Sequence, residues 1–63
     1  MNIASEMDRI QHFVDGGNYH AALNLSLSAL NECRRQHNQQ GIDTFIDLMK
    51  TIVNTLAEEF GSQ

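Results

Sequence analysis

The feature that most constrains this chain is the stretch of residues 18–37, NYHAALNLSLSALNECRRQH, which has the pattern of one largely apolar helix. At about 100° per residue, its large side chains fall on one stripe: Tyr19, Leu23, Leu27 and Leu30. Beside that stripe lie smaller residues, and two more residues widen the surface: Ala22, Ser26, Ala29 and Cys33, then Ala21 and Leu25. A helix that is apolar over more than half its circumference needs neighbours on two sides. We therefore expect this helix at the centre of the fold.

Two further amphipathic helices flank the central one. The first is predicted over residues 5–15, with Ser5 as its N-cap and two glycines, Gly16 and Gly17, at its end. The last is predicted over residues 43–60, with Asp43 as its N-cap. Residues 38–40 form a polar connector, and Gly41 stops or turns the chain. The sequence thus predicts an all-α, three-helix, antiparallel (up-down-up) unit in a single helical domain over residues 1–63.

The charge balance and composition limit the partners and the compartment. The 63 residues carry eight Asp and Glu against four Lys and Arg, a net charge of −4. Nucleic acid is not favoured as a partner, because phosphate backbones are bound largely through Lys and Arg. No segment reaches the roughly 20 apolar residues of a membrane span. A single cysteine allows no intramolecular disulfide, and we expect a cytoplasmic protein.

The apolar face of the last helix is broader than a short first helix can help to cover. We expect part of that face to be completed by another chain, identical or different. The candidate partner-binding residues share this face: Phe45, Leu48, Met49, Ile52, Leu56, Glu59 and Phe60. Glu59 lies at the edge of the apolar surface, where it can pair with a partner's Lys or Arg. The predicted partner is therefore a protein, in a homo-oligomer or a heteromeric complex.

No residue pattern here predicts catalysis, a cofactor or a small-molecule substrate. Cys33 and His37 lie four residues apart on a helix, but a structural zinc site needs about two more ligands. We favour the alternative interpretation, in which Cys33 is a small buried hydrophobic residue and His37 is a helix-end cation. Asp43 and Asp47 fall in the first turns of a helix, where the helix dipole favours acids. We expect no catalytic, cofactor-binding or metal-binding residues, and no enzyme activity.

Residues 17–30, GNYHAALNLSLSAL, resemble the turn and second helix of a tetratricopeptide (TPR) repeat. Five positions carry the resemblance: Gly17, Tyr19, Ala22, Ala29 and Leu30, with Phe13 in the place of the aromatic that precedes the turn. Ser26 departs from the pattern, since a large aromatic is usual there. The resemblance implies a helical hairpin that binds protein or peptide in a groove, without chemistry of its own.

The sequence favours a small protein-interaction module, such as an adaptor, co-chaperone or inhibitor, that binds its partner through apolar helix surface. A second hypothesis is a small homodimeric regulator, of the antitoxin or transcription-modulator type, that contacts nucleic acid. A third is a co-chaperone of type III secretion, by analogy of size and fold. Because fold does not fix function, these alternatives stay open at the level of sequence.

Overall fold

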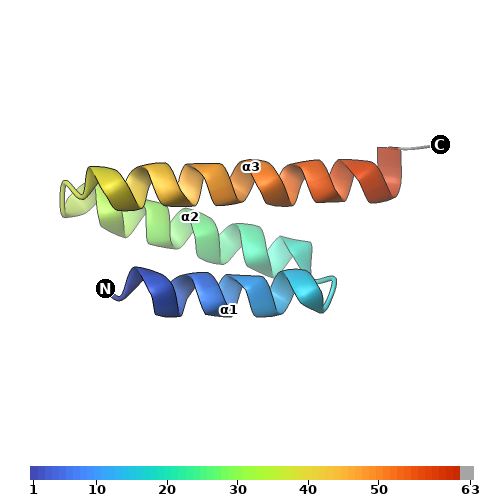
Figure 1. Cartoon of the computed structure of the whole chain (residues 1–63), viewed down its shortest axis with the longest axis horizontal. Helices are drawn as coiled ribbons and strands as arrows, with labels where there is room; N and C mark the ends of the chain where they lie inside the picture. The colour runs from blue at the N-terminus through green and yellow to red at the C-terminus, as the bar shows by residue number, and fades with distance from the viewer. Residues whose placement is uncertain (62–63) are drawn as a thin grey trace.

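The computed structural model describes residues 1–61, which form three helices: α1 (Ile3–Asp15), α2 (Tyr19–Arg35) and α3 (Gln39–Gly61). The helices run antiparallel in succession, and α2 lies between the other two (Figure 1). α2 packs against both α1 and α3, whereas α1 and α3 barely touch each other. The predicted all-α, three-helix arrangement with a central second helix is confirmed.

The two turns that join the helices have the same hydrogen-bond pattern. After α1, the N–H groups of Gly17 and Asn18 donate to Val14 O (3.0 Å) and Phe13 O (2.8 Å). After α2, the corresponding donors are His37 to Arg34 O (3.2 Å) and Asn38 to Cys33 O (2.9 Å). This paired pattern is a Schellman motif, which needs a left-handed residue just past the helix. Gly17 (φ 78°) and His37 (φ 56°) fill that place.

Asparagine caps the start of every helix. The side-chain oxygens of Asn2, Asn18 and Asn38 accept hydrogen bonds from the backbone N–H groups of Ser5, Ala21 and Gly41 at 3.1, 3.2 and 3.0 Å. Asparagine suits the N-cap position, because the oxygen of its short side-chain amide accepts a hydrogen bond from a backbone N–H group that the first turn of a helix leaves without a partner.

The caps correct several sequence-based boundaries. α1 begins at Ile3 with Asn2 as its cap, so Ser5 lies inside the helix. α2 ends at Arg35, two residues earlier than expected. α3 begins at Gln39, so the expected connector and the expected cap Asp43 are helical, and Gly41 does not stop the chain. Asn38 comes before Asp43 in the chain and directly follows the turn after α2, so Asn38 caps the helix and α3 begins there.

The core is built on the small residues of α2, not on its leucines. Its four buried residues are Ala22, Ser26, Ala29 and Cys33. The large buried side chains come from the flanking helices: Ile10 from α1, and Phe45 and Ile52 from α3. Small residues on α2 let both neighbours approach closely, so that large side chains close over them. Ser26 satisfies its buried hydroxyl by donating to Ala22 O at 2.8 Å. The expected leucine stripe borders this core, and its Leu27 is 47% exposed.

Gly41 marks the closest approach between α3 and the end of α2. A Cβ at this position would collide with Cys33 Sγ and would stand 3.2 Å from Ile3 Cδ1. Glycine is therefore required here by space rather than by backbone conformation. The contact also brings the first turns of α1 and α3 to the same end of α2.

We expect the substitution His37→Gly to stabilise the fold. His37 holds a left-handed φ of 56°, which costs a residue with a Cβ about 1 kcal/mol relative to glycine. Urea unfolding should show His37→Gly raising the free energy of unfolding by about 0.5–1 kcal/mol. The control is Gln36→Gly, at a neighbouring position with φ −90°. Equal destabilisation by both substitutions would contradict the assignment of His37 to the Schellman turn.

Gly41→Ala should destabilise the chain even though alanine is the better helix former. The added methyl meets Cys33 Sγ in a buried site, and overpacking of this kind costs about 1–3 kcal/mol. In a Cys33→Ala background the same substitution should cost much less, because the obstructing sulfur is gone. A double-mutant cycle measured by thermal unfolding tests this coupling. Additive effects of the two substitutions would show that they do not share one contact.

Candidate protein-interaction surface on helix α3

Helix α3 carries a continuous line of large apolar residues that its own chain covers only in part. These residues, here named the α3 seam, are Ile42, Ile46, Met49, Val53, Leu56 and Phe60. Ile46, Val53 and Phe60 are 37%, 50% and 70% exposed. The other three are half-buried. The seam runs along almost the whole helix, so its exposed part is a strip and not an isolated residue.

The spacing of the α3 seam alternates between four and three residues. This is the heptad spacing that keeps an apolar line facing one partner helix over its full length. The exposed residues Ile46, Val53 and Phe60 occupy one heptad position, and the half-buried ones occupy the other. The strip therefore has the geometry for knobs-into-holes packing with another helix.

The structure divides the expected partner-binding residues between the core and the surface. Phe45 and Ile52 are 0% and 1% exposed, so they belong to the intramolecular core. Leu48 is half-buried and packs against that core. The candidate surface excludes Phe45 and Ile52 as a correction, because both are buried in the core. Leu48 is left out because it lies about 60° round the helix from Phe45, on the side away from the seam. Met49, Leu56 and Phe60 lie on the α3 seam.

Sequence reasoning missed three residues of this surface: Ile42, Ile46 and Val53. Phe45 and Ile46 are about 100° apart on the helix, as are Ile52 and Val53. The sequence places both sets on one wide apolar face and does not say which edge turns toward α2. Spacing alone gives no signal that separates the two edges, because Phe45, Leu48 and Ile52 also repeat at alternating intervals of three and four.

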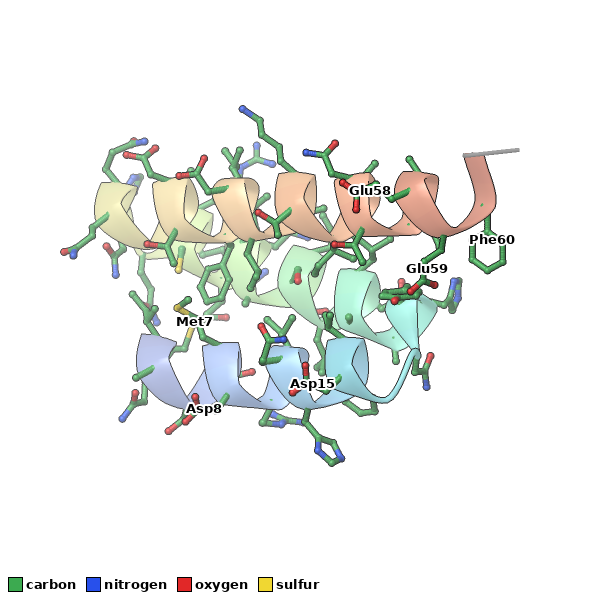
Figure 2. All side chains as sticks on the ribbon, turned by 45° about the vertical axis from the view of Figure 1, so that its right-hand side comes forward. Met7, Asp8, Asp15, Glu58, Glu59 and Phe60 are labelled. Carbon is green, nitrogen blue, oxygen red and sulfur yellow. The ribbon has the colours of Figure 1, made fainter. Side chains whose placement is uncertain are left out.

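Glu59 is engaged within the chain. Tyr19 Oη, at the start of α2, donates a hydrogen bond of 2.6 Å to Glu59 Oε1 near the end of α3. Figure 2 shows Glu59 directed toward the beginning of α2 while Phe60 projects from the last turns of α3 beyond it. This bond raises the pKa of Tyr19 above its ordinary value of 10.0; burial and the negative charge of Glu59 act in the same direction. The pair connects the start of α2 to the last turns of α3.

Leu27 adds an exposed apolar side chain on α2. It follows Tyr19 and Leu23 on one stripe of the helix. The Tyr19–Glu59 bond places the start of this stripe against α3. We infer from the stripe that Leu27, two turns further along, lies on the same side of α2.

Apart from the Tyr19–Glu59 pair, the polar side chains of residues 1–61 do not gather into a site with the geometry of a metal centre. A shallow hollow of about 330 Å³ is lined by Asn31, Arg34 and Arg35 on α2, and Arg35 is paired with Glu32. Cys33 is buried beside Gly41, whereas His37 is exposed in the turn. Among residues 1–61, three or more His, Cys, Asp or Glu side chains nowhere gather as metal ligands would. Within the same residues, no helix is both long and apolar enough to span a membrane.

Comparison of the chain with protein-family models, with curated proteins and with solved structures gave no match.

The Tyr19–Glu59 bond can be tested by titration. Tyr19 is the one tyrosine of the sequence, which has no tryptophan, so phenolate absorbance reports on it alone. We expect a pKa above 10.0 in the native chain and a return toward that value in Glu59→Ala. The stability that the bond supplies is present below pH 10 and is lost as pH rises through the raised pKa.

The control for this titration is Glu58→Ala, which removes the same charge one residue away. It should leave most of the shift in place, because the direct hydrogen bond to Glu59 is its largest cause. Equal shifts in both variants would mean that general negative charge, and not the Tyr19–Glu59 bond, sets the pKa.

Proposed function

We propose that this chain is a small, non-enzymatic protein-interaction module that binds a helix of a protein partner along the α3 seam. The observation that carries the proposal is the exposure of Ile46, Val53 and Phe60 at intervals of seven residues on one helix. Isolated surface leucines and isoleucines are normal, but a lengthwise strip of large apolar side chains marks an interaction site.

Burial of apolar surface supplies the driving force in this proposal. Covering a large aliphatic or aromatic side chain contributes about 1.5–3 kcal/mol when it is fully exposed beforehand, and proportionately less for half-buried ones. Phe60, at 70% exposure, stands to contribute most. Specificity then comes from the order of side-chain shapes along the seam, which decides which side chains of a partner helix fit between them.

The proposal covers adaptors, co-chaperones and inhibitors, which share this mechanism. The TPR-like pattern of residues 17–30 supports the same class of activity, since it implies protein or peptide binding. The net charge of −4 favours a protein partner over nucleic acid. A cytoplasmic location is part of the proposal and rests on the single cysteine.

Affinity purification with matched variants tests the proposed function. The tagged chain should capture a protein from the source cell, and Phe60→Asp should abolish that capture while leaving helix content unchanged by circular dichroism. A buried carboxylate at the seam costs several kcal/mol unless it finds a partner. The control is Asn54→Asp, which adds one charge at an exposed position away from the seam.

Equal capture by Phe60→Asp, Asn54→Asp and the native chain would contradict the proposed surface. Loss of helix content in Phe60→Asp would place that residue in the intramolecular core instead, against its observed exposure.

A further inference from the structure

We infer that the helix packed on the α3 seam is α3 of a second copy of this chain, running antiparallel, so that two chains form a symmetric four-helix bundle from their α2 and α3 helices. The inference rests on the proposed function, since it names the occupant of the proposed surface. Four observations support it: the symmetry of the seam, the side of α3 that α2 covers, the position of Leu27, and the area available.

The seam is symmetric under reversal. Thr51 lies at its midpoint, nine residues from Ile42 and nine from Phe60. In an antiparallel pair centred there, each exposed seam residue meets a half-buried one of the second copy. Phe60 faces Ile42, Ile46 faces Leu56, and Val53 faces Met49. Each pair combines side chains of different shape, and the widest residue, Phe60, never meets itself. A parallel pair would stack Phe60 on Phe60 and Val53 on Val53, which gives layers of unequal width.

The position of α2 also favours the antiparallel arrangement. Phe45, Ile52 and Glu59 directly precede the exposed seam residues and face α2, either buried in the core or bonded to Tyr19. In an antiparallel pair these flanking positions lie on the same side of both helices, whereas in a parallel pair they lie on opposite sides. The two α2 helices therefore come side by side, and the four helices close into a bundle.

Leu27 lies where the two α2 helices would meet. Tyr19 is level with Glu59 at one end of the α2–α3 pair, and Cys33 is level with Gly41 at the other. Between these contacts, Leu27 is level with about Met49, within one helical turn of Thr51. The two-fold axis of the antiparallel pair passes through Thr51, within a turn of this level. Leu27, 47% exposed and beside α3, would therefore pack against Leu27 of the second copy.

The area fits a modest dimer. The seam from Ile42 to Phe60 is roughly 27 Å long. Two such seams with both Leu27 side chains would remove on the order of 1,000 Å² from water, about the least area that a biological interface needs and typical of a weak one. Small chains of this kind bury little surface alone and often gain stability by association.

The net charge of −4 on each chain makes the salt dependence informative. Two like-charged copies repel, so added salt should strengthen a dimer held by apolar contacts. A positively charged partner would show the opposite dependence, because salt weakens attraction between unlike charges. Salt therefore separates a second copy from a basic heterologous helix.

Sedimentation equilibrium of the full chain tests the inference over about 1 µM to 1 mM protein. The mass should approach twice 7.1 kDa as concentration rises, and the dimer should strengthen between about 0.05 and 0.5 M salt. Val53→Asp should weaken association on the order of 100-fold, because each interface then buries two unpaired carboxylates. The control Asn54→Asp carries the same charge and should dimerise like the native chain.

Engineered disulfides test the orientation. The double variant Met49→Cys/Val53→Cys should oxidise rapidly to a covalent dimer, since positions 49 and 53 of the two copies face each other. Val53→Cys alone should crosslink poorly, because an antiparallel pair displaces the two positions by about 6 Å along helices some 8–10 Å apart, beyond the reach of a disulfide. The native Cys33 is 1% exposed and stays out of the reaction.

The outcomes separate this inference from the proposed function. If the chain is a monomer at every concentration, a second copy does not bind the α3 seam and the inference is wrong. The proposed function still stands in that case if Phe60→Asp abolishes capture of another protein. A dimer that Val53→Asp leaves intact overturns the inference, since the α3 seam is then not the interface. Rapid crosslinking of Val53→Cys alone overturns the antiparallel arrangement.

Discussion

The close packing of α1 and α3 onto the small residues of α2 is the interaction on which this structure depends. Ala22, Ser26, Ala29 and Cys33 offer little volume, so the neighbouring backbones approach and the large side chains of Ile10, Phe45 and Ile52 fill the space. The same principle explains Gly41, where the approach is close enough to exclude even a methyl group. A core of this type suits a short chain, because three large side chains and one stripe of small residues are enough to fill it. The three helices that the structure describes leave no further surface that could bury the other apolar residues.

The apolar residues that stay outside the core lie mainly on α3. The apolar face of this helix is wider than α2 can cover, and its uncovered residues form the α3 seam. One edge of the helix packs into the core, and the adjacent edge is exposed. The Tyr19–Glu59 bond fixes the relative position of α2 and α3 at the end where Phe60 projects. The rotation of α3 about its own axis therefore decides both which residues enter the core and which residues form the proposed surface.

The sequence predicted the three helices and their order because the apolar periodicity is strong in each. It predicted the boundaries less well, since several capping residues compete: Asn2 with Ser5, and Asn38 with Asp43. Gly41 does not stop the chain as the sequence predicts, because its role is a tertiary contact with Cys33, which local sequence does not reveal. On α3, periodicity identified a wide apolar face but could not tell Phe45 and Ile52, which face α2, from Ile46 and Val53, which do not. That choice depends on helix rotation, which packing sets.

The near absence of contact between α1 and α3 gives the chain a linear order of neighbours. Most tertiary contacts join helices that follow each other in sequence, so the contact order is low and rapid folding is favoured. Such a chain can also open in parts. α1 can detach while the α2–α3 hairpin, with its two end contacts at Tyr19–Glu59 and Cys33–Gly41, stays closed. Local opening at the amino-terminal helix would then leave the α3 seam unchanged, so that association and partial unfolding involve different parts of the molecule.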